Sequence, residues 1–401
     1  RKRKLHFDKL ILFMINKNGL TQTLEAYNFT NELKIDNFTR QAFYQGRMKL
    51  KPEIFKIMNK KFLEDFYKNE NFKTFKKYKL LAIDGSLTDL PNNKNLMKEF
   101  GGIKGSHNKF IKLKAQTSGI YDCLNNMMID FQIAPYQTSE KELAYKNIKN
   151  TLKLFKNNEI ILIFDRGYPS IELFNYLKEK NIKFIFRIKK DSYKEKTKQT
   201  QTNDEYIELK TKTKEKLKLR LVKIPLKNEK SYLITNLRKK EAKYNEINKL
   251  YKQRWEIEKS FEVLKNKLYL ENISGYTKIA VQQDYHSQIL TQNIIQDIKN
   301  KANQILKEKQ KQKNRKNKIQ KTLKKKKEKQ KKVNLNHLIG YFRKNILKIY
   351  QNKNSKEKYK KLEEIINLTL KSYTYETPNR HFKRIKKRTT PKNKTNIRRN
   401  S

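Results

Sequence analysis

Two aspartates follow the most strand-like stretches of the sequence and are the first residues that could do chemistry. Asp84 follows the apolar run at residues 80–83, and Asp165 follows the run at residues 160–164. In open α/β sheets, functional groups gather at the carboxyl ends of strands. Carboxylates on neighbouring strand ends can bind hard divalent cations such as Mg²⁺. A single aspartate in this position more often caps a turn or a helix, so the interpretation depends on a third ligand.

A helix predicted over residues 241–268 supplies that candidate ligand. Four of its side chains are spaced by three, four and seven residues, which places them within about 60° on one side of a helix: Tyr251, Arg254, Glu258 and Lys265. An adjoining stripe should pack on the sheet: Leu250, Ile257, Phe261, Leu264 and Leu268. A carboxylate flanked by cations suits a metal ligand beside phosphate contacts. The alternative is an ordinary helix surface with an Arg254–Glu258 ion pair.

Asp84, Asp165 and Glu258 together predict phosphodiester chemistry. Two metal ions about 4 Å apart stabilise both the attacking and the leaving oxygen of a phosphodiester displacement. We therefore expect Mg²⁺ as the cofactor, with Mn²⁺ able to substitute for it. We also expect the three carboxylates to lie close enough to share a cation site.

The same residues carry a resemblance to a known family. Tyr251, Arg254, Glu258 and Lys265 match the signature Tyr-x2-Arg-x3-Glu-x6-Lys at every position. This signature resembles that of the bacterial insertion-sequence DDE transposases in the family of the fourth numbered insertion element. The resemblance covers roughly residues 1–300. Further similar blocks occur in the family's order at residues 3–5, 43–52, 83–86, 104–107, 165–168 and 233–237.

The resemblance implies a ribonuclease H-like catalytic core with a β insertion before its last helix. In the family's terms, the metal-binding triad is Asp84, Asp165 and Glu258. The backbone of the transposon end would be contacted by Tyr251, Arg254 and Lys265, and we add Arg166 as a further DNA-binding candidate.

Some family members hold a flipped base with a tryptophan in the β insertion. The single tryptophan of this chain, Trp255, lies outside the corresponding segment. The device is therefore absent, or one of three tyrosines replaces it: Tyr193, Tyr206 or Tyr232.

The elements that must position these residues form an alternating pattern. Strands are predicted at residues 80–83, 110–121, 127–133, 160–164 and 184–188, and helices at 140–155, 170–180, 241–268 and 276–298. This order predicts an α/β architecture with a mixed sheet and flanking helices. Within the Lys- and Thr-rich residues 190–235, alternation at residues 216–224 and 232–234 predicts an inserted antiparallel β region before the long helix.

The two ends of the chain are expected to be helical and basic. Residues 1–75 should form short helices, and Thr39 can cap a helix that carries Arg47 and is closed by Pro52. That helix could lie in a DNA groove, with Arg47 as a DNA-binding residue, or be an ordinary surface helix. The predicted catalytic domain spans residues 76–298. Beyond it we expect a basic, partly disordered linker, a helical region and a basic disordered tail: residues 299–332, 333–370 and 371–401.

Composition restricts the partners and the compartment. The chain carries 96 Lys+Arg against 40 Asp+Glu, a net charge of +56, so a polyanion is the expected partner, with an anionic membrane surface as the weaker alternative. Its one cysteine excludes a disulfide framework and a cysteine-based zinc site. No apolar run reaches the length of a membrane span. Residues 1–15 faintly resemble a signal peptide, but charges interrupt the run, and we interpret it as the start of a core-facing helix.

The sequence thus predicts a DNA transposase that binds the ends of an insertion sequence and catalyses metal-dependent strand cleavage and transfer. Its expected partner is double-stranded DNA, on which it would act as a homodimer in the bacterial cytoplasm, near the nucleoid. One alternative is an endonuclease of the same fold without strand transfer. Another is a basic, non-catalytic DNA-binding protein. The intact triad and stripe count against this last alternative, because sequence drift should have broken some of their members.

Overall fold

The computed structural model describes residues 5–69, 71–104, 111–210, 216–225, 229–319 and 329–377. The chain divides into two compact units. The sheet unit comprises Ile57–Val263, and the helical unit combines Arg1–Lys56 with Leu264–Ser401. These units do not coincide with the ranges inferred from the sequence, because the N-terminal helices pack with C-terminal ones: α1 with α11, and α2 with α12.

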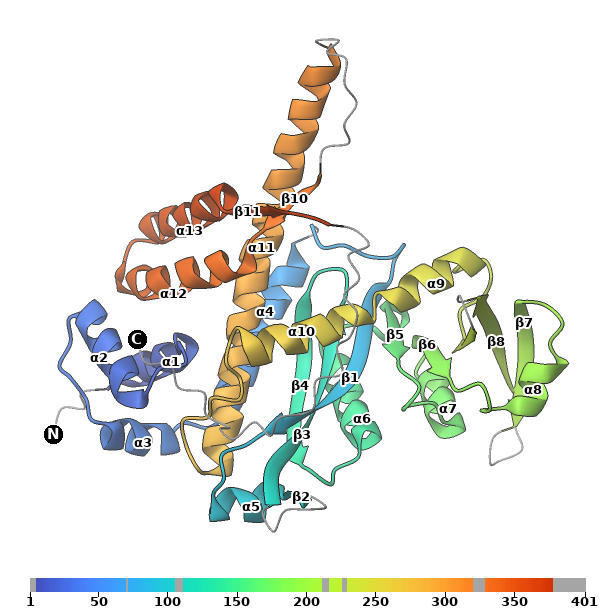
Figure 1. Ribbon diagram of the computed structural model, residues 1–401, viewed down its shortest axis with the longest axis horizontal. Helices are drawn as coiled ribbons and strands as arrows, with labels where there is room; N and C mark the ends of the chain where they lie inside the picture. Colours follow the sequence, from blue (N-terminus) through green and yellow to red (C-terminus); the bar gives the residue numbers. More distant parts are fainter. Residues whose placement is uncertain are drawn as a thin grey trace. The chain divides into compact units, whose positions relative to one another are not determined.

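The sheet unit is built around one large mixed sheet (Figure 1). Strands β1, β5 and β6 are parallel neighbours at its centre, and the other pairings are antiparallel. The described strand order is β2-β3-β1-β5-β6-β9-β8-β7, with β4 beside β3. The predicted mixed α/β architecture is therefore confirmed. The strands span Lys79–Asp89 (β1), Gly102–Lys104 (β2), Ile111–Asp122 (β3), Met127–Pro135 (β4), Ile160–Phe164 (β5), Lys183–Ile188 (β6), Asp204–Lys210 (β7), Lys216–Pro225 (β8) and Lys230–Thr235 (β9).

Strand β1 runs five residues beyond Asp84, so the prediction that this aspartate ends its strand was wrong. The reason lies in its two partners. Parallel pairing of β1 with β5 stops at Ile83 opposite Phe164, whereas antiparallel pairing with β3 continues to Asp89. Asp84 and Asp165 therefore each follow the last residue of the parallel pair.

Apolar helix faces and strand runs form the core of the sheet unit. All five residues of β5 are buried, and the rings of Phe164 on β5 and Phe186 on β6 stack with centroids 4.1 Å apart. Helix α6 begins where Ser139 accepts a hydrogen bond from the backbone N–H of Glu142. The helices of this unit besides α4, α9 and α10 are Lys94–Phe100 (α5), Glu140–Thr151 (α6), Ile171–Glu179 (α7) and Lys194–Gln199 (α8), with a short 3₁₀ turn at Asn157–Glu159.

The predicted β insertion is antiparallel, as expected, and it extends the main sheet through the pairing of β9 with β6. A buried arginine joins it to the next helix. Arg220 binds the carboxylate of Asp204 at 2.6 and 2.7 Å and donates to the carbonyl of Ala242 at 2.6 Å. This anchor lies two residues before helix α9, which carries Tyr251.

The single long helix predicted over residues 241–268 is two helices, Tyr244–Lys252 (α9) and Trp255–Asn266 (α10). At their junction the Arg254 N–H bonds the Tyr251 carbonyl and the Ile257 N–H bonds the Arg254 carbonyl, both i→i−3 contacts. Regular spacing of 100° per residue therefore does not continue through Arg254. The adjoining apolar stripe is buried as predicted: Leu250, Ile257, Phe261, Leu264 and Leu268.

The helical unit contains the N-terminal helices and most of the C-terminal region. Its elements are Phe7–Ile15 (α1), Gln22–Leu33 (α2), Arg40–Met48 (α3), Lys278–Ile319 (α11), Lys331–Val333 (β10), Leu335–Gln351 (α12), Ser355–Lys371 (α13) and Tyr373–Tyr375 (β11), while α4, Glu53–Lys68, begins at its edge. The short N-terminal helices, the Thr39 cap and the core-facing run in α1 are confirmed.

Helix α11 corrects the expectation of a linker from residue 299 onward, because it continues to Ile319. Ala302 and Leu306 are buried along it, so the apolar face of the helix continues into the lysine-rich segment that begins at residue 299. The remainder of that segment at residues 320–328, the motif residues 105–107, residues 1–4, and most of the predicted tail at residues 378–401 lie outside the described residues.

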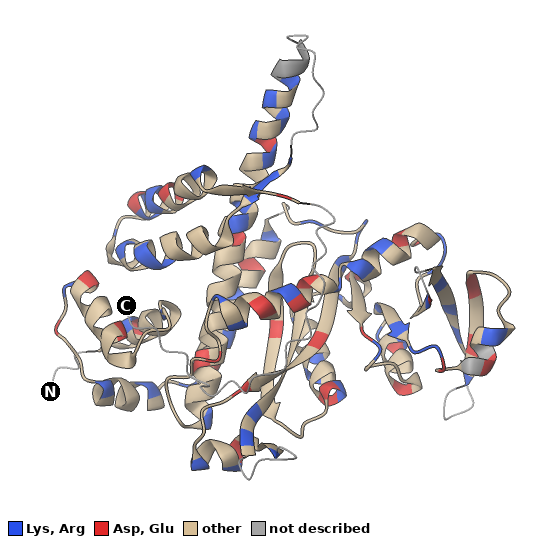
Figure 2. Ribbon diagram, in the orientation of Figure 1, with Lys and Arg blue, Asp and Glu red and all other residues tan. Residues whose placement is uncertain are grey.

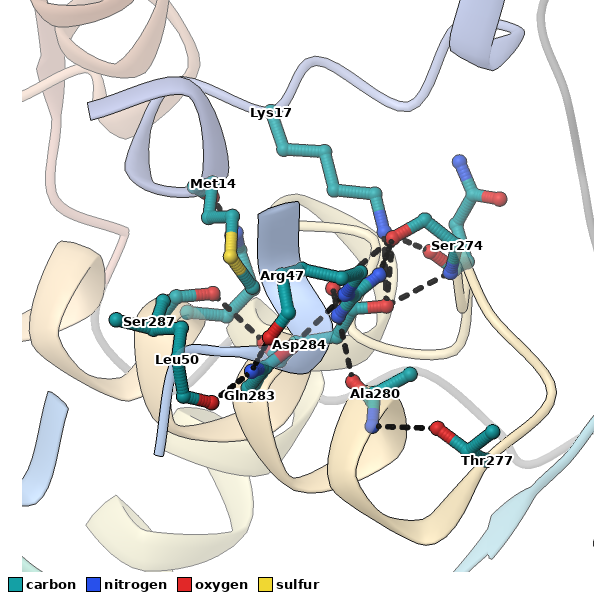
Figure 3. A network of polar contacts seen from close by, with 12 residues as sticks. Met14, Lys17, Arg47, Leu50, Ser274, Thr277, Ala280, Gln283, Asp284 and Ser287 are labelled. Atoms are coloured by element: carbon teal, nitrogen blue, oxygen red, sulfur yellow. Dashed lines mark hydrogen bonds and ion pairs between the residues drawn. The ribbon is translucent and has the colours of Figure 1, made fainter. Parts of the chain in front are cut away.

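Arg47, expected to contact DNA, is instead a core residue of the helical unit (Figure 3). Its side chain is 1% exposed and pairs with Asp284 at 2.9 Å. The same guanidinium donates to Gln283, Ser274 and the carbonyl of Ala280. With four donor contacts already made inside the protein, Arg47 is not available to DNA, and the prediction was wrong.

Arg47→Met is expected to lower the free energy of unfolding by about 3–5 kcal/mol, because it leaves the buried Asp284 carboxylate without its main partner. Although burial opposes it, Arg47 and Lys17 hold the pKa of Asp284 below 3.8. The ion pair therefore stabilises the fold fully at pH values above the pKa of Asp284 in the unfolded chain. This stabilisation is lost as the pH falls through the lower pKa of Asp284 in the folded protein. Urea unfolding at pH 7 measures the loss. A variant that unfolds like wild type but loses DNA affinity would restore the DNA-contact interpretation.

Candidate active site

The candidate site forms where β1, β5 and the α9–α10 junction meet in the sheet unit. Asp84 lies on β1 one residue beyond the end of its parallel pairing, and Asp165 directly follows β5. Tyr251 lies on the last turn of α9, Arg254 lies in the junction, and Glu258 lies on the first turn of α10. Two adjacent strands and two consecutive helices thus bring together residues separated by up to 174 positions.

The Arg254 guanidinium lies between the three carboxylates. Its Nη1 is 3.2 Å from Asp84 Oδ2, and its Nη2 is 2.6 Å from Glu258 Oε1 and 4.0 Å from Asp165 Oδ2. The guanidinium is 5% exposed, whereas the carboxylates are 20–36% exposed. The Tyr251 hydroxyl donates to Asp165 Oδ1 at 3.3 Å. All three carboxylates therefore converge on one positive group.

The site carries more negative than positive charge. Burial, with smaller contributions from the nearby Glu258 and Asp165, raises the pKa of Asp84 to about 6 against the opposing effects of Arg254 and the Gly85 backbone N–H. Burial and Asp165 together raise the pKa of the Tyr251 hydroxyl above its ordinary value. Among the described residues, the buried Arg254 Nε has no hydrogen-bond partner. One guanidinium leaves these carboxylates incompletely neutralised, so a second positive group would be stabilised here.

The donor set fits a hard divalent cation, because it consists of carboxylate oxygens on separate elements that open to solvent on one side. Within the described part of the chain, no group of three His, Cys, Asp or Glu side chains is spaced to hold a metal ion. The cation that Asp84, Asp165 and Glu258 share in this arrangement is the Arg254 guanidinium. A metal ion would have to take over contacts that the guanidinium now makes.

The other predicted DNA contacts lie on exposed or partly exposed positions. Arg166 is exposed in the turn after Asp165. The Lys265 side chain is 22% exposed, and its ammonium lies 3.9 Å from Glu271 Oε1. Arg166 lies beside Asp165 because it is the next residue in the chain, and Lys265 lies two turns beyond Glu258 along α10.

The three tyrosines considered for base stacking differ in exposure. Tyr206 is exposed, with the Lys218 ammonium 5.4 Å from its ring centroid. Tyr193 and Tyr232 pack against the hydrophobic core. Trp255 is also exposed, and the Arg254 guanidinium lies 5.4 Å from its ring. Of the three tyrosines, Tyr206 is therefore the one with an exposed side chain.

The sequence analysis missed a fourth carboxylate beside the site, Glu140 at the start of α6. A Cβ added at Gly85 would lie 2.7 Å from Glu140 Oε1, so a larger residue directly after Asp84 would push this carboxylate aside. Gln116 on β3 donates to the same oxygen at 3.3 Å. Glu140 appeared in the sequence only as a residue of a helix start. The Asp84-Gly85 pair was the available signal, because it indicates that another group approaches the backbone closely.

Comparison with known proteins identifies the family of the chain. Residues 75–294 match the model of a family described as the transposase DDE domain. Because the match covers more than half of the chain and contains all three carboxylates, the protein belongs to the DDE transposase family. It is thus a transposase, and members of this family generally use divalent metal ions.

Two solved structures show weaker likeness. A cryo-EM structure of the piggyBac transposase synaptic complex with hairpin DNA is 12% identical, with a TM-score of 0.37 over 92% of this chain and 75% of that one. The crystal structure of a pre-cleavage Mos1 transpososome is 12% identical, with a TM-score of 0.19 over 46% of this chain and 59% of that one. No curated protein matches the chain. Among the described helices, none has the length and apolarity that crossing a bilayer requires.

Proposed function

We propose that this transposase cuts and joins DNA with Asp84, Asp165 and Glu258 as its metal-binding carboxylates. We further propose that it belongs to the Tyr-x2-Arg-x3-Glu-x6-Lys type of bacterial insertion-sequence enzymes and has a ribonuclease H-like core. The observation that carries the proposal is the convergence of the three carboxylates, from two neighbouring strands and one helix, on a single cation.

In this proposal Asp84, Asp165 and Glu258 hold Mg²⁺, or Mn²⁺ in its place. A divalent ion at such a site lowers the pKa of bound water and neutralises charge that develops on phosphate oxygens. The chain itself supplies position. Tyr251 and Arg254 lie beside the carboxylates and can contact a phosphate, and the guanidinium has the geometry for two parallel hydrogen bonds to it.

The reaction has two steps, hydrolysis and joining. The joining step forms one phosphodiester bond for each one that it breaks. Water first cleaves one phosphodiester and leaves a 3′-hydroxyl at the end of the element. That hydroxyl then replaces the 3′-oxygen of a phosphodiester in the target DNA. The role of the protein is to align the hydroxyl with the target phosphate and to exclude other geometries.

Double-stranded DNA is the proposed partner, both as inverted-repeat ends and as target. The net charge of +56 favours binding to a polyanion, and we assign backbone contacts to Tyr251, Arg254, Lys265 and Arg166. Because two ends must be held together for joining, we propose a homodimer on DNA. The catalytic role falls to the sheet unit, and the helical regions at both ends of the chain would contribute to DNA binding.

A joining assay tests the proposal against that of a simple endonuclease. The substrate is a precut duplex that carries the inverted repeats flanking the coding sequence, incubated with supercoiled plasmid and Mg²⁺. Wild-type protein is expected to insert the duplex into the plasmid, and Asp165→Asn is expected to do so at least 100-fold more slowly, on the order of the loss of several kcal/mol of transition-state stabilisation. Asp191→Asn, at an exposed loop position, is the matched control.

Nicking of uncut ends without joining of precut ends would overturn the strand-transfer part of the proposal. Equal joining by wild type and Asp165→Asn would remove this aspartate from the site.

A further inference from the structure

A groove lined by lysines and tyrosines lies in the C-terminal part of the helical unit, outside the segment that matches the family. It encloses about 680 Å³ between the outer part of α11, the β10–β11 ribbon and the end of α13. Basic positions recur along α11 and β10 (Figure 2). The charged and aromatic residues that line it are Lys309, Lys313, Lys329, Lys331, Tyr373 and Tyr375. Among the described lining residues none is acidic.

The aromatic wall of the groove has a defined arrangement. Tyr373 and Tyr375 are two residues apart on β11, so their rings lie on the same side of the ribbon. The rings meet edge to face, with their centroids 5.6 Å apart. The Lys331 ammonium lies 3.9 Å from the Tyr373 ring centroid and so covers one face of that ring. The Tyr375 side chain is 51% exposed. Tyr375 therefore presents ring surface to a ligand, and Tyr373 supports it.

The basic wall is attached to the same frame. Lys309 and Lys313 are exposed and one turn apart on α11, so they lie on the same side of that helix. Between them, Gln310 donates to the Lys329 carbonyl at 3.2 Å and accepts from the Lys331 N–H at 3.3 Å. These two contacts hold Lys329 and the first residue of β10, Lys331, against the helix. The cationic groups are thus held around the aromatic wall by backbone contacts.

From this arrangement we infer that the groove binds a single-stranded stretch of DNA, with phosphates beside the lysines and an unpaired base on Tyr375. Cationic grooves with exposed aromatic rings bind single strands because each unpaired base offers a face for stacking. A base in an intact duplex is already stacked on its neighbours and cannot use the ring. The inference rests on the proposed function for its choice of DNA as the polyanion, and it adds a second contact outside the catalytic unit.

The test measures binding of full-length protein to a fluorescein-labelled, mixed-sequence duplex with a single-stranded 3′ overhang, and to the same duplex with blunt ends. Tyr375→Ala is expected to weaken overhang binding by roughly tenfold, the typical effect of losing one stacked base, and to leave blunt-duplex binding unchanged. Tyr375→Phe keeps the ring and should bind like wild type. Tyr359→Ala, which removes an exposed tyrosine of α13, is the matched control.

A second variant tests the lysines by salt dependence. Lys309→Gln/Lys313→Gln should reduce the slope of log affinity against log salt by roughly 1.4 for the overhang, because each lost phosphate contact contributes roughly 0.7 on a single strand. Lys356→Gln/Lys360→Gln removes an equally spaced pair of exposed lysines on α13 and should leave the slope near that of wild type.

The outcomes separate this inference from the proposed function. If Tyr375→Ala binds overhang and blunt DNA like wild type while nicking and joining persist, the inference is wrong and the proposed function stands. If the variants lose overhang binding as expected but wild type neither nicks nor joins DNA, the groove is supported and the proposed function is wrong. If wild type binds phosphatidylserine vesicles and Tyr375→Ala loses that binding while its DNA binding is unchanged, the inference is also wrong, and the groove binds a lipid surface.

Discussion

Glu258→Gln is expected to slow nicking of an end-containing duplex by several orders of magnitude while DNA affinity stays equal or rises. Glutamine keeps the size of the side chain but removes the charge that a metal ligand needs. A metal ion contributes several kcal/mol of transition-state stabilisation, and each 1.36 kcal/mol is about a factor of ten in rate. Affinity should not fall, because one negative charge beside the DNA phosphates has been removed.

The measurement is a nicking assay with Mg²⁺ beside a gel shift on the same duplex. Glu262→Gln is the matched control, because Glu262 lies one turn further along α10 and is exposed. Its rate should match that of wild type. If Glu258→Gln nicks as fast as Glu262→Gln, the glutamate has no part in the chemistry.

Arg254→Ala is expected to change three properties: stability, the response to Mg²⁺ and binding of DNA ends. Without metal or DNA, the protein should lose about 1.5–3 kcal/mol of stability, the range for a hydrogen bond to a charged group, because three carboxylates lose their shared counterion. Addition of Mg²⁺ should then stabilise the variant more than it stabilises wild type, since the ion no longer competes with the guanidinium. Binding of the element's ends should weaken by a similar 1.5–3 kcal/mol through the loss of a phosphate contact.

Thermal unfolding with and without Mg²⁺, together with a gel shift, measures these effects. Arg238→Ala is the control, because the Arg238 side chain is 60% exposed and its partner Glu241 keeps a second cation, Lys183, at 2.9 Å. An Arg254→Ala protein that is as stable as wild type without metal, and no more responsive to Mg²⁺, would contradict the role of Arg254 as the counterion of the site.

Local patterns predicted the elements whose apolar periodicity is strong. Strand β5 spans the predicted residues, and α7 lies within one residue of its predicted ends at each side. Both are flanked by turn residues and bury their apolar side chains, so sequence and tertiary packing favour the same structure. The same agreement predicted Asp165 as a strand-end residue.

The break between α9 and α10 could not be predicted from local sequence. Gln253 and Arg254 are good helix formers, and no glycine or proline marks the junction. We attribute the break to tertiary contacts: Arg254 is tied to Asp84 on β1 and to Glu258 on α10. The predicted stripe nevertheless identified residues that meet in space, because Tyr251 and Arg254 both reach the aspartates.

Arg47 shows why a charge pattern misleads about function. Its partner Asp284 lies 237 positions away, so nothing near Arg47 in the sequence distinguishes a buried ion pair from a DNA contact. Glu140 was missed for a similar reason, since it reaches Gly85 only through the packing of α6 on the sheet. Both cases depend on long-range contacts.

The most direct test of the central claim is anomalous diffraction from crystals of the protein grown with Mn²⁺ and an end-containing duplex. The account predicts a manganese peak within about 2.0–2.6 Å of carboxylate oxygens from Asp84, Asp165 and Glu258, the usual range of metal–oxygen bonds, with the Arg254 guanidinium moved from between them. A manganese ion bound by other side chains, or no manganese peak between these three carboxylates, would contradict it.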